Sequence, residues 1–241
     1  PEKLGKRVLT TGGHFGYLKI AEGCDKHCTY CIIPKLRGKF RSVPMERLVT
    51  QAKEMAEEGV KELILVAQET TVYGTDIYGK KSLHILLKEL CKIKGIRWIR
   101  VLYCYPEEIY DELIQTMKEE KKICHYLDLP IQHASDRILK RMGRRTTQAE
   151  LVEIVNKLRR EIPDIVLRTT LISGFPGETQ EDHEELMGFV DEMEFDRLGV
   201  FTYSPEEDTP AATMPDQVAE EVKEARRDEI MELQQEISYD K

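Results

Sequence analysis

The chain has 241 residues, which is enough for one sizeable domain. Hydrophobic residues make up 41% and charged residues 33%, a composition that excludes disordered and fibrous proteins. Its 44 acidic residues outnumber the 36 basic ones, so the formal net charge is −8 and a general affinity for phosphate backbones is disfavoured. Six cysteines are too few for a disulfide scaffold, the first residues lack a secretion signal, and no apolar run approaches the ~18 residues of a membrane span, so we expect a reducing, cytoplasmic location without membrane contact.

The hydrophobic pattern alternates between strand and helix along the chain. Residues 17–21 predict a first strand, and Pro44 begins a helix that ends near Gly59. Residues 62–67 are mostly apolar, which predicts a strand buried on both faces. Further strands are predicted at residues 98–104, 125–129, 165–172 and 197–203. Further helices are predicted to begin at Ser82, at about Glu107, at Thr147 and Thr179 with capping boxes, and at about Asp216.

Six strand–helix units in series imply a parallel sheet with right-handed connections. The count falls short of a complete eight-unit barrel, so we predict an α/β fold, an open six-stranded partial TIM barrel. In such folds the site lies at the carboxyl ends of the strands. We expect one domain over residues 1–241. The chain starts without methionine and ends within a helical pattern, so we expect it to be a fragment of a longer protein.

Three cysteines follow the first strand within eight residues, namely Cys24, Cys28 and Cys31 in a C-x₃-C-x₂-C run. Thiolates are soft ligands that suit iron–sulfur clusters or zinc. A 4Fe-4S cluster needs one ligand for each of its four irons, so three cysteines leave one iron open to a small molecule. The run therefore favours a cluster with one open iron.

The alternative is a zinc-organised interaction module without enzymatic activity. A structural zinc site closes with four ligands, usually as two separated pairs. Here the fourth ligand would be His27, and its neighbour Cys28 cannot easily point at the same centre. No second CxxC or HxxxH pair is present.

At these cysteines the sequence resembles the radical S-adenosylmethionine (SAM) superfamily, with Tyr30 at the aromatic position of its motif. The resemblance implies a partial β/α barrel, in agreement with the strand count. It also implies that SAM binds the open iron and that one electron from the reduced cluster cleaves SAM to a 5′-deoxyadenosyl radical. The cofactors would carry the chemistry, and the protein would position them.

Four further stretches resemble the methylthiotransferases of that superfamily, at residues 66–74, 127–135, 171–179 and 203–207. These enzymes insert a methylthio group at a C–H bond. One branch, the RimO type, modifies the β-carbon of an aspartate in ribosomal protein twelve of the small subunit. Another branch modifies an adenosine in transfer RNA.

Three local forms favour the ribosomal-protein branch, and the tRNA branch remains the alternative. They are Gln68-Glu69-Thr70-Thr71, Gln132-His133 and Ser204-Pro205-Glu206-Glu207, where the RNA branch has Gln-Asn-Val, Gln-Ser and Arg-Pro. Glu69 and Asp208 depart from the branch pattern, which usually has Asp and Gly at those positions. The acidic net charge also favours a basic ribosomal protein as the partner.

The resemblance implies parts that this sequence does not contain. They are an amino-terminal domain whose second 4Fe-4S cluster delivers sulfur and a small carboxyl-terminal β-barrel domain. The other cysteines, Cys91, Cys104 and Cys124, are too widely spaced for the second cluster and are interpreted as small buried hydrophobes. A flavodoxin-like electron donor is also implied.

Five polar or glycine residues are candidate SAM contacts in addition to Tyr30. Gln68 and Glu69 lie at the superfamily's position for contact with the SAM amino group, with a polar loop pair as the alternative. Gln132 could reach SAM or the transferred sulfur, or instead pin the adjacent turn. Arg168 could bind the SAM carboxylate or form an internal salt bridge. Gly174 could let the backbone approach the adenine or serve only a turn.

Two remaining features are given structural interpretations. The basic run of Lys140, Arg141, Arg144 and Arg145 is interpreted as a solvated face, with RNA or phosphate binding as the alternative. His133 is interpreted as a structural histidine rather than a proton carrier.

Overall fold

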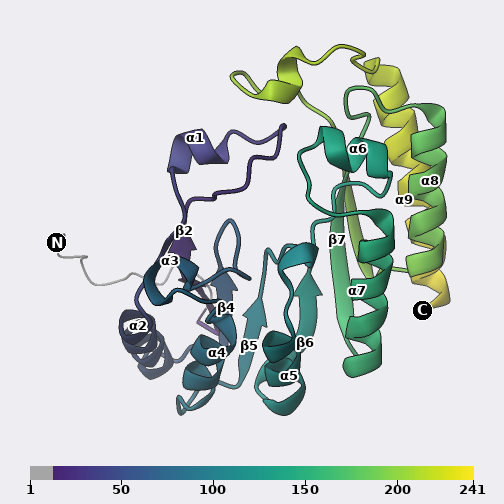
Figure 1. The fold of residues 1–241 in the computed structure, drawn as a ribbon. Coiled ribbons are helices and arrows are strands. Elements are labelled where there is room, and N and C mark those ends of the chain that lie inside the picture. Colours follow the sequence, from purple (N-terminus) through teal and green to yellow (C-terminus); the bar gives the residue numbers. More distant parts are fainter. Residues whose placement is uncertain (1–12) are drawn as a thin grey trace.

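The computed structural model describes residues 13–241; the first twelve residues, on which the judgement about a secretion signal depends, lie outside the described part. Six parallel strands form one sheet in the order β1-β4-β5-β6-β7-β8 (Figure 1). Their bounds are β1 Phe15–Lys19, β4 Glu62–Val66, β5 Trp98–Val101, β6 Ile123–Asp128, β7 Val166–Ser173 and β8 Arg197–Thr202. A short antiparallel ribbon joins β2 (Ala21–Glu22) to β3 (Arg41–Ser42).

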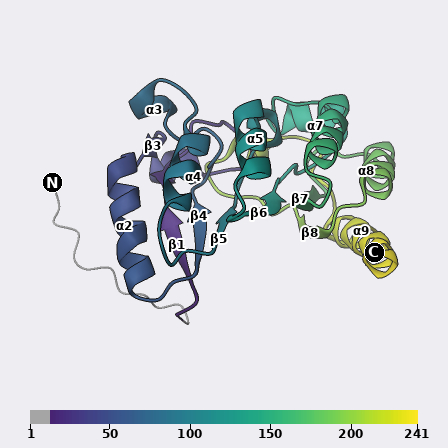
Figure 2. The same cartoon turned by 90° about the horizontal axis from the view of Figure 1, so that it is seen from below.

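Helices run between successive strands and after the last one. The larger ones are α2 Met45–Glu57, α4 Leu83–Cys91, α5 Asp111–Glu119, α7 Gln148–Glu161, α8 Gln180–Met193 and α9 Glu220–Asp240. The shorter ones are α1 Ile33–Arg37, α3 Thr75–Tyr78, η1 Pro106–Glu108, α6 Asp136–Arg141 and η2 Pro210–Thr213. Seen from below, the sheet curves into a crescent with the larger helices on its convex side (Figure 2), and β1 and β8 form its two edges. This arrangement is the predicted six-stranded partial TIM barrel.

The core lies between the sheet and its outer helices because side chains alternate along each strand. In β4, Leu63 and Leu65 are fully buried in this core, whereas Ile64 and Val66 on the concave side are only half-buried. The prediction that this strand is buried on both faces is therefore wrong. An open barrel leaves its concave side accessible, and that side is available for a ligand or substrate.

Several element boundaries differ from the predicted ones. The helix expected from Glu107 is divided into η1 and α5, because Pro106 opens a tight turn and the backbone returns to an extended conformation at Ile109 and Tyr110. The last helix begins at Glu220 rather than near Asp216. The short helices α1, α3 and α6 lie within segments expected to be loops.

The two predicted capping boxes form to different extents. Thr179 has the complete reciprocal pair of bonds with Asp182. Thr147 accepts the backbone N–H of Glu150, which is half of the pattern. Ser82 stands at the start of α4 but donates its hydroxyl to the Lys80 carbonyl instead of capping the helix. Within residues 13–241, no helix has the length and apolar character needed to cross a membrane.

Candidate iron–sulfur and SAM site

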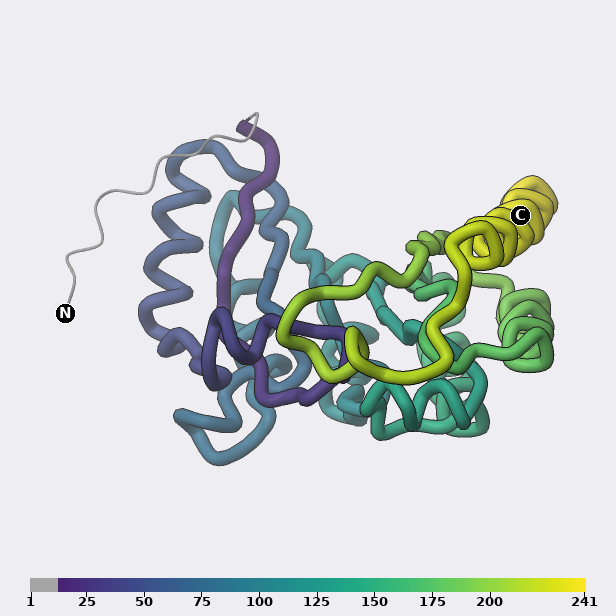
Figure 3. The backbone as a smooth tube through the Cα atoms, turned by 90° about the horizontal axis from the view of Figure 1, so that it is seen from above, coloured from purple at the N-terminus to yellow at the C-terminus, as the bar shows by residue number. Residues whose placement is uncertain are grey.

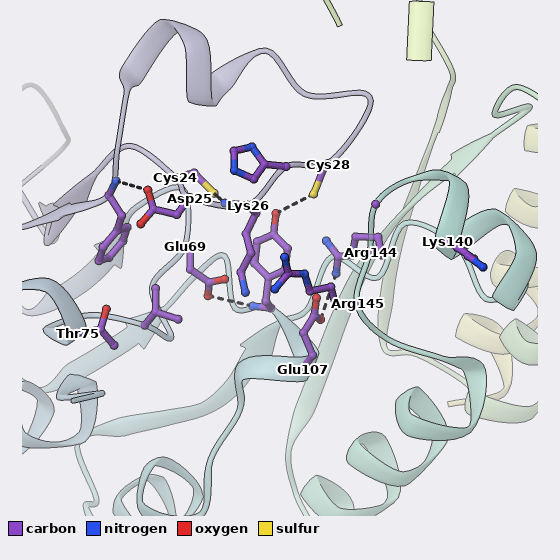
Figure 4. Close-up of a pocket in the computed structure, with 15 residues that line it drawn as sticks. Cys24, Asp25, Lys26, Cys28, Glu69, Thr75, Glu107, Lys140, Arg144 and Arg145 are labelled. Atoms are coloured by element: carbon purple, nitrogen blue, oxygen red, sulfur yellow. Dashed lines mark hydrogen bonds and ion pairs between the residues drawn. The ribbon is translucent and has the colours of Figure 1, made fainter. Parts of the chain in front are cut away.

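A cavity of about 580 Å³ opens at the carboxyl ends of the strands, where the site was expected (Figure 4). Its size suits a small molecule. The wall comes from the cysteine loop and from the loops after β4, β5 and β6. Its lining includes Cys24, Asp25, Lys26, His27, Cys28, Phe40, Glu69, Val72, Thr75, Tyr105, Glu107, Lys140, Gly143, Arg144 and Arg145.

The start of the cysteine loop is fixed by a glycine that no other residue could replace without rearrangement. Gly23 has φ +81°, and a Cβ there would lie 2.3 Å from the Lys39 carbonyl oxygen. The Gly23 N–H donates to the side-chain oxygen of Gln68 at 3.0 Å. Asp25 accepts the N–H of Phe40 at 3.0 Å, and this bond joins the segment just after β2 to the segment just before β3.

The far end of the loop is held by two loops from the opposite half of the barrel (Figure 3). The Thr29 N–H donates to the Met142 carbonyl at 2.8 Å, and the Thr29 carbonyl accepts the Ala211 N–H at 2.9 Å. Gly143 packs closely against this loop, since a Cβ there would lie 2.8 Å from the His27 carbonyl oxygen. The cysteine loop is thus tied to the loops after both β6 and β8.

The three cysteines lie together, but they do not all face the cavity. Cys24 and Cys28 are buried and line it, whereas Cys31 is half-buried and donates its N–H to the Cys28 carbonyl at 3.1 Å. Burial raises the pKa of the Cys24 thiol to about 11, and the nearby Cys28 and Cys31 add to the shift. Burial also raises the pKa of Cys31. Tyr30 packs edge-to-face against Phe175, with 6.4 Å between ring centroids.

The donor set fits an iron–sulfur cluster better than a single ion. In the described part of the chain, no three His, Cys, Asp or Glu side chains converge on one metal ion. A zinc ion would need its ligands at about 2.3 Å from one point. The irons of a 4Fe-4S cluster each take one thiolate, so separated thiols suit it. Metal binding requires the thiolate forms and would release the protons that burial now retains.

Glu69 supplies the cavity with an unused acceptor. Its side chain is 1% exposed, and Oε1 accepts the N–H groups of Thr71 at 3.2 Å and Tyr105 at 3.4 Å as well as the Thr71 hydroxyl. Its Oε2 is buried with no hydrogen-bond partner among the described residues. Burial raises the pKa of Glu69 to about 7. An ammonium group in the cavity would satisfy this oxygen.

The two candidate glutamines hold backbone segments near the cavity without lining it. The Gln68 oxygen is occupied by Gly23, as described above. Gln132 has φ +71°, and its backbone bonds to Thr170 and Ile172 of β7. Its side-chain oxygen is buried and has no partner in the described structure. A direct contact of either glutamine with SAM remains a prediction.

Arg168 and Gly174 also lie outside the cavity wall. Arg168 alternates with the buried residues of β7 and lies near Asp128; burial raises the pKa of Asp128, while the Tyr103 N–H and the positive charge of Arg168 lower it. Gly174 packs against α9, since a Cβ there would lie 2.2 Å from the Cγ atom of Lys223. Their roles toward SAM likewise remain predictions.

Four residues of the cavity wall do not follow from the sequence: one was given the wrong environment, and three have no recognisable pattern. Arg144 is 5% exposed, so the interpretation of this basic residue as part of a solvated face is wrong. The left-handed turn at Gly143 directs the chain back onto the cysteine loop and carries Arg144 inward. Lys26, Tyr105 and Glu107 were not recognised, because no local pattern distinguishes them from ordinary loop residues.

The structural interpretation of His133 agrees with its environment. His133 is fully buried, and its Nδ1 accepts the N–H groups of Ala134 and Ser135, both at 3.0 Å. Its Nε2 therefore carries the proton and donates to Glu178 at 2.8 Å. The ring fixes the loop after β6 and does not reach the cavity lining.

Comparison with known proteins agrees with this geometry. Residues 18–190 match the Radical SAM superfamily, which is most of the chain. The chain belongs to the radical SAM superfamily. Its cysteine motif and cavity lie at the carboxyl ends of the strands, where the sites of β/α barrels lie.

Two curated relatives of this radical SAM chain carry the same name. The chain is 70% identical over 235 residues to the ribosomal protein uS12 methylthiotransferase RimO of Lachnoclostridium phytofermentans, and the match covers 98% of this chain and 53% of that protein. It is 62% identical over 234 residues to the protein of the same name from Clostridium perfringens, covering 97% and 53%. The chain thus spans about half the length of the curated relatives it matches.

Solved structures confirm the radical SAM fold. The methyltransferase TsrM of Kitasatospora setae, with cobalamin and a 4Fe-4S cluster bound, aligns with a TM-score of 0.67 and 18% identity over 83% of this chain and 39% of that one. SuiB of Streptococcus suis bound to S-adenosylmethionine aligns with a TM-score of 0.60 and 17% identity over 91% and 47%.

Proposed function

We propose that this chain is the radical SAM core of a ribosomal protein uS12 methylthiotransferase. The observation that carries the proposal is the 70% identity to a RimO protein over 98% of the chain, combined with a cavity walled by two of the three motif cysteines. When bound, the 4Fe-4S cluster and SAM would together supply the radical chemistry that activates a C–H bond of the substrate.

The residues of the chain have distinct tasks in this proposal. Cys24, Cys28 and Cys31 hold three irons and leave the fourth without a protein ligand. Glu69 offers its unpaired Oε2 to the SAM amino group. Gln132 carries another buried side-chain oxygen without a partner in the described residues, on a backbone with positive φ near the cavity. The hydrogen bonds of Thr29 to the loops after β6 and β8 hold the cysteine loop in place, with Cys24 and Cys28 buried at the cavity.

The substrate proposal is supported by the residues that distinguish the two branches. Thr70 and Thr71 are fully buried, and the Thr71 hydroxyl bonds to Glu69 beside the cavity. His133 is held by Glu178 in the loop after β6. Of these branch-specific residues Glu69 lines the cavity and Thr71 supports it, whereas His133 fixes the loop after β6; the −8 charge suits a basic ribosomal protein.

The complete reaction needs components beyond this chain. The relatives are almost twice as long, which accords with a sulfur-delivering domain that holds a second 4Fe-4S cluster and with a small β-barrel domain. A flavodoxin-like protein would supply the electrons. Cytoplasmic location accords with ribosomal protein as the substrate.

The substrate is tested with the full-length parent protein, reconstituted anaerobically and supplied with SAM, sulfide and reductant. Ribosomal protein uS12 and unmodified tRNA are offered in separate reactions and analysed by mass spectrometry. We expect a methylthio group on one aspartate of uS12 and none on tRNA. Modification of tRNA alone would reverse the branch assignment.

The metal centre is tested by analysis of the anaerobically purified chain. Iron and sulfide in equal amounts, a brown colour and an EPR spectrum that changes with SAM support the proposal. A colourless protein that binds one zinc ion would support the zinc-organised module instead.

A further inference from the structure

A layer of side chains lies behind Cys28 that the cysteine motif does not explain. The Tyr105 hydroxyl lies 3.6 Å from the Cys28 sulfur, within hydrogen-bond range for sulfur (Figure 4). Tyr105 comes from the loop after β5, far from the motif in sequence. Its backbone N–H also bonds to Glu69, so one residue connects a cluster thiol to the acceptor in the cavity.

Arg144 covers the ring of this tyrosine. Its guanidinium carbon lies 4.3 Å from the Tyr105 ring centroid, and its side chain is 1% exposed. Lys26 also approaches the ring, at 5.4 Å, but it is engaged in an ion pair with Glu108. Arg144 is therefore the deeply buried cation of the cavity wall.

The hydrogen bonds of Arg144 are incomplete. One Nη atom donates to the Pro130 carbonyl at 3.0 Å and lies 3.5 Å from the Glu107 carboxylate. Its Nε and its other Nη atom are buried without partners in the described structure. A buried cation with unused donors is unfavourable unless negative charge is nearby. A cluster on Cys28 would place that charge beside it.

We propose that Tyr105 and Arg144 act as positioning residues that raise the reduction potential of the cluster. The inference rests on the proposed function, because it needs a cluster on Cys28. When the cluster takes one electron from a low-potential donor, no bond is made or broken and one negative charge is added. A hydroxyl that donates to a ligand sulfur and a buried cation both stabilise the reduced form more than the oxidised form.

The two contributions can be separated by substitution. Tyr105→Phe removes the hydroxyl and keeps the ring under Arg144. Arg144→Lys keeps the positive charge, whereas Arg144→Gln removes it. Tyr110→Phe is the matched control, because it removes a phenol hydroxyl that bonds to His84 and to none of the three motif cysteines.

The test is a redox titration of the anaerobically reconstituted chain, followed by EPR. At a fixed potential we expect Tyr105→Phe to lower the ratio of reduced to oxidised cluster about tenfold, which for one electron corresponds to roughly 59 mV. Arg144→Gln should shift the potential in the same direction, while Arg144→Lys and Tyr110→Phe should stay near the wild-type value.

The outcomes distinguish this inference from the proposed function. Iron content and the SAM-induced change in the EPR spectrum should persist in Tyr105→Phe. An unshifted potential in that iron-loaded variant would overturn the inference alone. If the wild-type chain assembles no cluster, the proposed function and the inference fail together.

Discussion

The side chains of His133 and Glu178 are hydrogen-bonded at 2.8 Å and are both fully shielded from solvent. The second Glu178 oxygen accepts Arg226 of α9 at 2.9 Å and the Gly174 N–H at 3.2 Å. One carboxylate thus joins the loop after β6, the loop after β7 and the last helix.

Substitution of Glu178 should therefore destabilise the fold strongly. Glu178→Gln leaves Arg226 as an uncompensated buried cation, so we expect a loss of roughly 3–5 kcal/mol in the free energy of unfolding. Urea denaturation followed by circular dichroism measures it. Glu229→Gln is the control, because Glu229 pairs with His183 but is 54% exposed, and it should cost less than about 1 kcal/mol. Equal losses in the two variants would contradict the role given to Glu178.

The raised pKa of Glu69 predicts how stability depends on pH. Burial raises this pKa from its ordinary value of 4.5 to about 7, against the lowering effects of Thr71 and Lys26. The folded state binds the proton more tightly, so the stability it contributes is complete below pH 4.5 and is lost as pH rises to about 7. The total is on the order of 3 kcal/mol.

Urea unfolding of the chain without added iron, at pH 5 and pH 8, tests this dependence. Glu69→Gln should lose less stability between the two pH values than the wild type, by on the order of 3 kcal/mol. The exposed Glu57→Gln should behave as the wild type. If Glu69→Gln keeps the full wild-type pH dependence, another group is responsible for it.

Gly143 offers a test of the contact between the loop after β6 and the cysteine loop. Gly143→Ala and Gly79→Ala both place alanine at a positive φ, +74° and +73°, but a Cβ at Gly79 meets nothing within 4 Å. Backbone strain is therefore similar, and only Gly143→Ala collides with the His27 carbonyl. We expect Gly143→Ala to retain several-fold less iron after reconstitution than Gly79→Ala. Similar iron contents would show that this contact does not support the loop.

The motif cysteines should be individually required for the metal. Cys24→Ser, Cys28→Ser and Cys31→Ser should each reduce iron from about four per chain to a small fraction, because a cubane cluster held by three thiolates loses a necessary ligand. Cys91→Ser is the control, since Cys91 is half-buried at the end of α4. Iron and sulfide assays give the result, and an undiminished iron content in Cys31→Ser would remove Cys31 from the ligand set.

The chain alone should perform only the first part of the proposed reaction. With its cluster reduced by dithionite, it should cleave SAM to 5′-deoxyadenosine and methionine, as measured by chromatography. No methylthio product should form, because the proposal assigns sulfur delivery to a part of the longer relatives that is not in this reaction. A methylthiolated uS12 protein made with this chain as the sole source of clusters would contradict that division.

The sequence predicts those features that follow from local periodicity or from a short motif. The strand–helix alternation predicts the open barrel, and the cysteine motif points to the loop whose Cys24 and Cys28 line the cavity. It does not predict which loop residues meet across the barrel. Tyr105 reaches Cys28 only because parallel strands bring their loops to one edge, and Arg144 is buried only because the chain turns at Gly143. Such contacts have no sequence periodicity.

The contacts between the cysteine loop and residues 208–211 determine when during synthesis this loop can reach its final position. The Thr29 carbonyl accepts the Ala211 N–H, and Lys35 donates to the Asp208 carbonyl at 2.5 Å, so both partners come from a segment about seven-eighths of the way along this sequence. A nascent chain that contains only the first strands therefore has the contacts at the start of the cysteine loop but lacks those that hold its far end. The contacts that hold the far end of the cysteine loop against residues 208–211 can form only after the sixth strand and the turn beyond it have been synthesised.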